Sequence, residues 1–157
     1  MSPLYETLKR AGARLHQPAT EEHIRSIELR YDIVIPPGAR QLYMEANGAD
    51  GEFGSWSWNF WPVDATELRL SDYFKHPRAY VVGERKIDPS KYLRFFDVLI
   101  DAPLYAYCAD TSSMHYGEVL AIYSDNGTFE SEISARSASS FLDILAKTET
   151  EESLIFE

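Results

Sequence analysis

One stretch of the chain gathers the residue types that hydrolytic enzymes use. It carries a carboxylate, two hydroxyls and an imidazole, on Asp110, Ser112, Ser113 and His115. A serine nucleophile, a histidine base and an orienting acid form a catalytic triad, but tertiary structure assembles such triads from distant positions. The nucleophile-elbow motif of many hydrolases is missing, and the stretch is rich in turn formers. We therefore predict a polar loop between two strands, and a small hydrolase ranks third among our hypotheses.

Metal-ligating residue types are spread along the chain without the spacing of a metal site. The histidines are His16, His23, His76 and His115. None of them stands at the i, i+4 spacing from another, and Cys108 has no nearby cysteine, so zinc and iron–sulfur sites have no support. The segment 125–127 lacks the alternating carboxylates and the final glutamate of a calcium loop. We expect no metal and no cofactor, and we expect Cys108 to be a small core residue.

Four neighbouring aromatic residues could stack on sugars or nucleobases. The segment 55–60 alternates, with Trp56, Trp58 and Phe60 on one side. A period of two is typical of a half-buried strand, so we predict that these three rings lie in the core. Trp61 points the other way, and we expect it to be exposed or covered by a neighbouring segment.

The negative charge of the chain is concentrated in its last third. The formal net charge is −10; residues 1–100 hold 14 acidic and 13 basic side chains, a sum of −1, whereas residues 101–157 hold 11 and 2, a sum of −9. Such a field repels nucleic acid and anionic membranes and attracts basic partners. The alternative is a negative surface that only keeps the protein soluble. Acids interrupt the basic stretch 75–94, so we predict that it does not bind DNA or RNA.

The elements that position these residues follow from the periodicity of the chain. We expect helices at 3–15, 21–31 and 38–46, and a short helix within 62–75. We expect strands at 55–60, 80–82, 93–99, 104–108, 118–124 and 129–133, and a glycine-rich loop at 48–54. A last helix is capped by Ser137 or Ser139 and turns Ala138, Phe141, Leu142 and Leu145 inward. Segregated helices and strands indicate an α+β fold, with helices packed around a mainly antiparallel or mixed sheet.

Two Asn-Gly pairs mark tight turns. We expect Asn47-Gly48 to end the third helix, with one of the two residues at positive φ. Asn126-Gly127 stands between two strand-like runs, which is a strong hairpin signal. A two-residue turn there pairs Asp125 with Thr128, Tyr123 with Glu130, and Ala121 with Glu132.

The register of this hairpin predicts a surface. It puts Leu120, Ile122, Phe129 and Ile133 on one face, which must be core. Tyr123, Glu130 and Glu132 share the other face, and carboxylates without nearby cations avoid burial. We predict that this face binds a basic protein partner, because tyrosine adds contact area at little cost in entropy. Asp110 and Glu118 are the other residues that we assign to partner binding. The alternative is a solvated face without a partner.

The segment 28–48, ELRYDIVIPPGARQLYMEANG, resembles the opening signature of the SUKH superfamily, the Smi/Knr-type domain. The shared features are a Glu-containing helix, a proline after a short extended piece, a helix and Asn-Gly; the family's Leu-Pro is Ile35-Pro36 here. The segment 61–68, WPVDATEL, looks like the piece that follows the family's first strand, and Gly117-Glu118-Val119 looks like its later Gly-x-Val strand. The closing helix also matches in position, so the resemblance covers about 20–147. The family's Gly/Asp-rich stretch is glycine-free at 97–102, which leaves the subfamily open. We assign structural roles to Pro36, Asn47, Gly48, Trp61 and Gly117.

The resemblance implies an α+β fold and a protein-binding function without a catalytic residue. Many bacterial members are immunity proteins that neutralise a toxin, often a nuclease, and fungal relatives regulate cell-wall synthesis. We therefore expect an immunity-type protein that occludes the active site of a basic toxin domain. An intracellular regulatory or scaffold adaptor of the same fold is the alternative.

Length and apolar content favour one domain outside membranes. We expect a single domain over 1–157, with its core at about 20–147 and an acidic tail at 148–157. No run approaches the ~18 apolar residues of a membrane helix, and the N-terminal segment has no apolar signal-peptide core. A single cysteine excludes an internal disulfide. These features favour the cytoplasm, and the oligomeric state is open.

Overall fold

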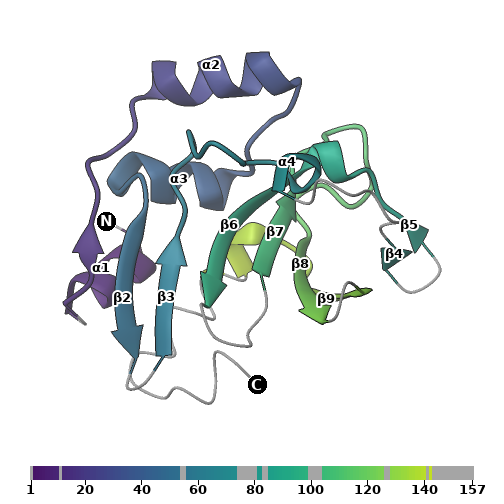
Figure 1. Ribbon diagram of the computed structural model, residues 1–157. Coiled ribbons are helices and arrows are strands. Elements are labelled where there is room, and N and C mark those ends of the chain that lie inside the picture. The colour runs from purple at the N-terminus through teal and green to yellow at the C-terminus, as the bar shows by residue number, and fades with distance from the viewer. Residues whose placement is uncertain are drawn as a thin grey trace.

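The chain folds into a layer of helices and an antiparallel sheet, so the predicted α+β class is confirmed (Figure 1). The computed structural model describes residues 2–10, 12–53, 56–73, 81–82, 85–98, 104–125, 128–140 and 142. Its helices are α1 (Pro3–Arg10), α2 (Glu21–Tyr31), α3 (Pro37–Glu45), α4 (Leu70–Tyr73) and the 3-10 turn η1 (Pro89–Lys91). Its strands are β1 (Arg14–Leu15), β2 (Ala49–Phe53), β3 (Trp56–Phe60), β4 (Val81–Val82), β5 (Arg85–Lys86), β6 (Tyr92–Val98), β7 (Leu104–Cys108), β8 (Val119–Asp125) and β9 (Thr128–Ala135).

The sheet runs through the strands nearly in chain order. Within the described ranges it has seven strands in the order β1-β2-β3-β6-β7-β8-β9, and each neighbouring pair is antiparallel. Strands β4 and β5 form a separate two-stranded hairpin that stands at the side of the sheet near β9 (Figure 1). Antiparallel strands that follow one another in the chain need only short connections, so turn-forming residues are frequent between them.

Local chemistry sets the ends of α2 and α3. Thr20 accepts a hydrogen bond from the backbone N–H of His23 at 3.1 Å and so caps α2. Helix α3 starts at Pro37, where the missing N–H of proline costs nothing. It ends at Glu45, and Gly48 follows at φ +104°. The prediction for Asn47-Gly48 is therefore confirmed.

Two predicted elements near the N-terminus are wrong. The first helix was expected to reach residue 15, but α1 ends at Arg10 because Gly12 adopts φ +76° and its N–H turns back to the carbonyl of Lys9 at 3.2 Å. The freed residues form β1, which pairs with β2. The segment 48–54 was expected to be a loop, yet Ala49–Phe53 is strand β2. Pairing with β3 along its whole length outweighs the low strand propensity of Gly51.

The hairpin register is confirmed. Asp125 pairs with Thr128, Tyr123 with Glu130, and Ala121 with Glu132. Leu120 and Ile122 are buried, as predicted for the core face. Ala121, on the opposite face, is also buried at 2% exposure, so this end of β8 is covered on both sides. The side chains of 123–135, which include the predicted surface residues and Phe129 and Ile133, lie outside the part of the chain that the structure describes.

Both faces of the central strands carry apolar clusters. We call the larger one, which contains side chains of α1, α2 and α3, the helix-side core. The smaller one on the other face, the far-side core, contains Leu70, Tyr92, Leu104, Ala106, Cys108, Leu120 and Ile122, with Ile87 packed against it. Strand β7 alternates between them, because Tyr105 and Tyr107 enter the helix-side core and the other three residues enter the far-side core; all five are buried.

Two further predictions concern residues at the edge of the described chain. Phe60 is buried in the helix-side core and Asn59 is half-buried, which confirms the predicted alternation at the end of β3; the side chains of Trp56 and Trp58 are not described. The last helix is capped by Ser137, whose Oγ accepts from the N–H of Ser140 at 3.1 Å. Ala138 and Leu142 are buried as predicted, whereas Phe141, Leu145 and the tail 148–157 lie outside the described residues.

Candidate functional site

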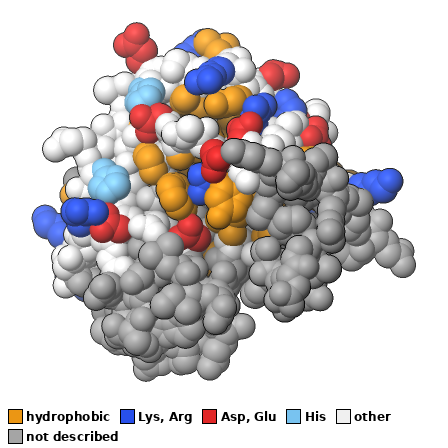
Figure 2. Space-filling model, in the orientation of Figure 1, with side chains coloured by type: hydrophobic (Ala, Val, Ile, Leu, Met, Phe, Trp, Pro, Cys, Tyr) orange, Lys and Arg blue, Asp and Glu red, His pale blue; other side chains and the backbone are white. Residues whose placement is uncertain are grey.

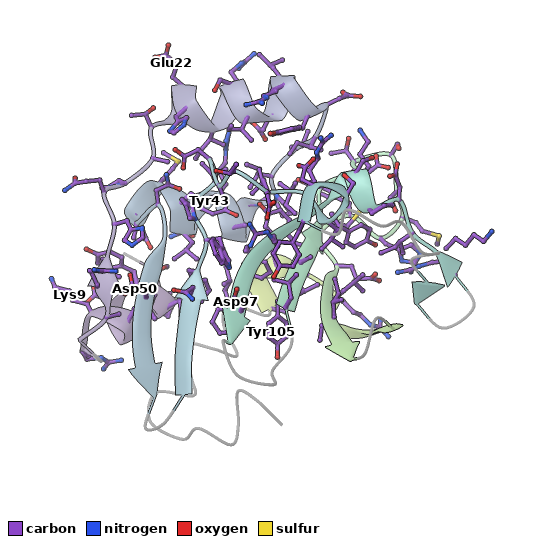
Figure 3. The ribbon with its side chains drawn as sticks, viewed as in Figure 1. Lys9, Glu22, Tyr43, Asp50, Asp97 and Tyr105 are labelled. Atoms are coloured by element: carbon purple, nitrogen blue, oxygen red, sulfur yellow. The ribbon has the colours of Figure 1, made fainter. Side chains whose placement is uncertain are left out.

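A row of polar side chains crosses the half of the sheet formed by β1, β2, β3 and β6. The strand register places Arg14 beside Asp50, Asp50 beside Asn59, and Asn59 beside Asp97. Asn59 and Asp97 are half-buried, and the Asp50 side chain is 30% exposed. Figure 3 shows Asp50 and Asp97 on β2 and β6 on the side toward the viewer. We call this surface, together with Trp61 next to it, the open sheet face.

Asp97 is the hub of the open sheet face. Its Oδ2 accepts from the indole Nε1 of Trp61 at 2.8 Å, and its Oδ1 accepts from Nδ2 of Asn59 at 3.3 Å. The backbone N–H of Trp61 bonds to the carbonyl of Phe95 at 2.8 Å, which fixes the ring beside β6. Trp61 is therefore half-buried and held by both its ring nitrogen and its backbone.

Arg94 lies under this surface, a feature that sequence reasoning missed. Its guanidinium stacks on Trp61 at 4.3 Å and on Tyr73 at 4.4 Å from the ring centroids. Its Nε donates to the backbone carbonyl of Glu67, and its own N–H donates to the carbonyl of Leu68 at 2.9 Å. Arg94 is only 3% exposed, and burial lowers the pKa of its guanidinium. It thus ties the loop after β3 to the sheet. The signal in the sequence was a charge inside the apolar run of a central strand.

The Asn47-Gly48 turn connects α3 to the same loop. Oδ1 of Asn47 accepts from the N–H of Val63 at 2.8 Å, and its Nδ2 donates to Asp64 at 3.1 Å. The carboxylate of Asp64 lies 3.7 Å from Nε2 of His23. The structure therefore brings Asn47, Gly48 and Trp61 together around one loop.

A second group of motif residues lies at the start of α3. Glu28 of α2 accepts from the N–H of Ile35 at 2.8 Å and from Arg40 at 3.3 Å. Pro36 is buried, and a Cβ built on Gly117, which has φ +83°, would lie 4.0 Å from the ring of Pro36. Glu28 is thus a structural tie that holds the extended segment before the proline.

The loop 110–117 forms turns rather than a catalytic triad. Oδ1 of Asp110 accepts from the N–H and the Oγ of Ser112 at 3.0 and 2.6 Å, and these bonds lower the pKa of its carboxyl. Oγ of Ser113 accepts from the backbone N–H of His115 at 3.1 Å. Burial raises the pKa of the Cys108 thiol, which opposes the thiolate form that a nucleophile needs. The predicted polar loop is confirmed.

Glu118 belongs to the interior instead of the surface to which we assigned it. It is 5% exposed and pairs with Arg85 of β5. Nδ1 of His115 lies 3.4 Å from its Oε2, and the hydroxyl of Tyr92 lies 3.5 Å from its Oε1. A carboxylate held by these groups cannot also face a partner, so Glu118 serves to attach the β4–β5 hairpin to the sheet.

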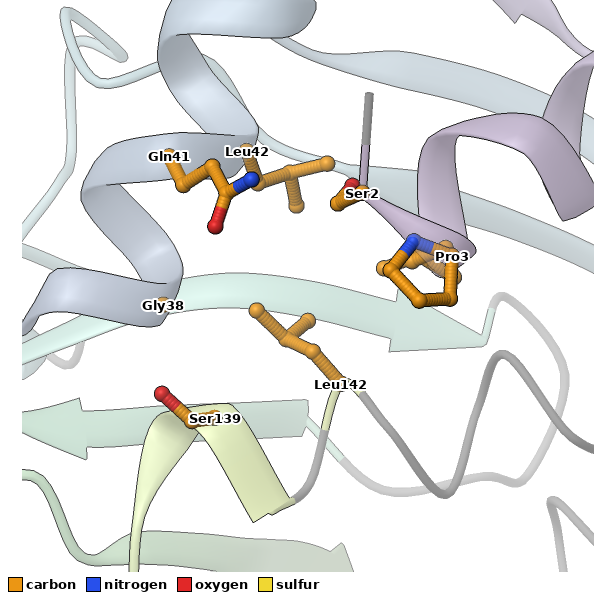
Figure 4. Close-up of a pocket in the computed structure, with 8 residues that line it drawn as sticks. Ser2, Pro3, Gly38, Gln41, Leu42, Ser139 and Leu142 are labelled. Carbon is orange, nitrogen blue, oxygen red and sulfur yellow. The ribbon is translucent and has the colours of Figure 1, made fainter.

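One small pocket lies between the start of α1, α3 and the last helical turn (Figure 4). Its volume is about 80 Å³, which leaves room for only a few waters at about 30 Å³ each. It is lined by Ser2, Pro3, Leu4, Gly38, Gln41, Leu42, Ser139 and Leu142. Nothing of substrate size fits there.

The model of the SMI1 / KNR4 family (SUKH-1) matches residues 18–147. The chain belongs to this family. The match confirms the resemblance seen in the sequence and supplies the subfamily, SUKH-1, that the sequence left open. SUKH-1 proteins are generally associated with immunity and are typically non-catalytic. A search of curated proteins finds no match.

Two general features bear on this SUKH-1 chain. Across its described ranges, none of the helices has the length and apolar content needed to cross a bilayer. Over those same ranges, no three His, Cys, Asp or Glu side chains gather in a group that could hold a metal ion.

Proposed function

We propose that this SUKH-1 protein is an immunity-type inhibitor that binds a toxin domain and occludes its active site. Family membership carries the proposal. The Asp110–His115 loop supports it, because its hydroxyls and carboxylate are engaged in turns. We propose that the protein acts without catalysis and without a cofactor, as one domain in the cytoplasm.

Charge indicates the kind of toxin. Residues 101–157 sum to −9, and such a field accelerates encounter with a basic surface. A nuclease exposes basic groups that hold phosphates, and carboxylates of the inhibitor can occupy the same positions. We therefore propose that the partner is a basic toxin domain with a phosphate-binding surface like that of a nuclease. The proposal includes neither nucleic acid nor a membrane as a partner.

Co-expression with each candidate toxin encoded beside this chain tests the function. The wild-type protein should restore growth of cells that express the toxin. The two purified proteins should form a complex with one toxin molecule bound to each inhibitor molecule. Absence of both binding and protection with every neighbouring toxin would refute the proposal. Capture of several endogenous proteins without protection would favour the adaptor alternative. Loss of protection in a folded Ser112→Ala/Ser113→Ala/His115→Ala variant, with binding retained, would favour the hydrolase.

We propose that the surface of the β8–β9 hairpin contacts the toxin, as predicted from the sequence. Tyr123 of β8 pairs with Glu130 of β9, and Glu132 follows two residues along β9, where it pairs with Ala121. Asp110 is the other acidic residue assigned to partner binding. Glu130→Lys with Glu132→Lys should leave thermal unfolding unchanged and weaken toxin binding about ten-fold or more, since reversed charges repel a basic partner. A folded variant with undiminished affinity would place the contact elsewhere.

A further inference from the structure

We propose that the open sheet face around Trp61 and Asp97 docks a lysine- or arginine-bearing segment of the protein partner. This inference deepens the proposed function and names a surface separate from the hairpin. In Figure 2, apolar side chains gather in the middle of this face around a basic one, with carboxylates at their edge. This face combines negative charge, a buried donor without an acceptor and side chains that are held in place.

The exposed charge around Trp61 is negative. Asp97 accepts from the neutral donors Trp61 and Asn59, and Asp64 accepts from the neutral amide of Asn47. The nearby cations offset only part of this charge. Arg94 lies within Coulomb range of Asp97, but the carboxylates of Asp64, Asp72 and Asp97 outnumber the guanidinium groups of Arg69 and Arg94 by one. Arg94 is 3% exposed, and the guanidinium of Arg69 is held by both oxygens of Asp72 at 2.8 and 2.9 Å. A cationic side chain is therefore the complementary ligand.

Arg94 supplies an independent observation. Its Nη1 is buried and finds no hydrogen-bond acceptor among the described residues, although Trp61 and Tyr73 cover both faces of the group. A buried donor without an acceptor costs about 1–3 kcal/mol. Tyr73 is 40% exposed and stacks on the same guanidinium, so the group lies directly beneath the surface at this ring. A backbone carbonyl of a docked segment meets that need.

The negative charge and the unpaired Nη1 of Arg94 can be satisfied by the same bound segment. A segment with a basic side chain brings a cation for Asp97 and a carbonyl for Arg94 within one or two residues of each other. Tryptophan, tyrosine and arginine are the residues most enriched at the centres of protein interfaces. Here the hydrogen bond from Trp61 to Asp97 and the stacking on Arg94 hold them in place before binding, which limits the entropy lost on docking.

Titration with short peptides tests the surface without a toxin. The probe is acetyl-Gly-Arg-Gly-Arg-Gly-amide, and the reporter is the indole N–H resonance of Trp61, identified among the three tryptophans by its loss in Trp61→Phe. The arginine peptide should shift this resonance saturably, with a dissociation constant on the order of 1 mM. The same peptide with glutamate in place of arginine should not. Equal shifts with both peptides, or no saturable shift with the arginine peptide, would overturn the inference.

Matched variants separate the surface from total charge. Asp64→Asn with Asp97→Asn removes two charges and keeps acceptors for Asn47 and Trp61. Glu22→Gln with Asp32→Asn removes two charges from exposed positions on and after α2. The first pair should weaken peptide binding about ten-fold and the second less than about three-fold. Equal losses in two folded proteins would show that only net charge matters, and would refute a site.

The same variants, measured with the toxin, distinguish this inference from the proposed function. If the toxin binds and the Asp64/Asp97 pair loses about ten-fold in affinity, both stand. If the toxin binds the pair with full affinity, the docking surface is refuted and the immunity function stands. If no toxin is neutralised, the immunity function fails, and the peptide titration alone decides whether the open sheet face binds basic segments.

Discussion

Substitution of Gly48 by alanine measures how tightly the chain is packed at the corner after α3. Gly48 has φ +104°, a conformation that side chains disfavour. A Cβ built there would lie 2.7 Å from Nδ1 of His16 and 3.1 Å from the carbonyl oxygen of Phe60. The imidazole can move, at the loss of its 3.2 Å contact with Asp50. The carbonyl belongs to the sheet and cannot move without disturbing β3.

Gly12 provides a matched control. It has φ +76°, but a Cβ built there has nothing within 4 Å. Gly12→Ala therefore carries only the conformational cost, about 1–2 kcal/mol. Gly48→Ala carries a similar cost and the steric conflict as well, so we expect it to lose about 2–4 kcal/mol of the free energy of unfolding. The difference between the two variants isolates the close approach of the strands.

Urea denaturation of both variants, followed by circular dichroism, measures this difference. Each kcal/mol corresponds to about 2–4 °C in Tm for a domain of this size, so thermal unfolding should give the same order. Equal destabilisation of Gly12→Ala and Gly48→Ala would show that the contacts with His16 and Phe60 yield easily, and the packing argument would fail.

Three further predictions concern buried polar groups. Arg85→Ala should lower the free energy of unfolding in urea by about 2 kcal/mol, because Glu118 is 5% exposed and loses its cation; a loss no larger than that of Arg85→Leu/Glu118→Leu would contradict this. Tyr43→Phe should cost about 1–2 kcal/mol by removing the 2.9 Å contact with the hydroxyl of Tyr107. Burial raises the pKa of both phenols above the ordinary 10.0, so the free energy of unfolding of the wild-type protein should fall as the pH rises past 10.0. The same fall in a Tyr43→Phe/Tyr107→Phe protein would show that these two phenols are not its cause. Burial also raises the pKa of Cys108, so a thiol reagent at pH 8 should label it only as fast as the protein unfolds; rapid labelling of the native protein would exclude this.

Sequence reasoning succeeded where neighbouring residues decide the structure. The Asn-Gly pair at 126–127 predicted the pairing of β8 and β9, and the pairs of Asp125, Tyr123 and Ala121 match that prediction. Thr20 marked the start of α2 because a cap acts within a few residues. The Asn47-Gly48 pair marked the end of α3 to within two residues, although the cap position is Ala46 in an extended conformation. Family membership came from motifs whose residues hold the fold, such as Pro36 and Trp61.

It failed where the deciding partner is distant in the chain. Glu118 directly precedes β8 and was predicted to be a surface acid, but Arg85, 33 positions earlier, pairs with it in the interior. Strand β1 forms by pairing Arg14 with Asp50 and Leu15 with Ala49, more than 30 positions later in the chain. Arg94 lies in a strand that the sequence predicted, but its burial depends on the rings of Trp61 and Tyr73. Such tertiary partners leave no periodic trace in the sequence.

The double-sided burial of β7 has a consequence for how the molecule opens. All five of its residues are buried between the two cores, whereas β1 is two residues long and carries the 79% exposed side chain of Arg14. The sheet is thus covered on both faces at its centre and more exposed to solvent toward β1. In native-state hydrogen exchange, amides of β7 should become accessible only when the whole protein unfolds, while β1 and the outer edge of β2 should exchange through local fraying. The end of the sheet that carries the open face can therefore loosen and close again while the centre stays folded.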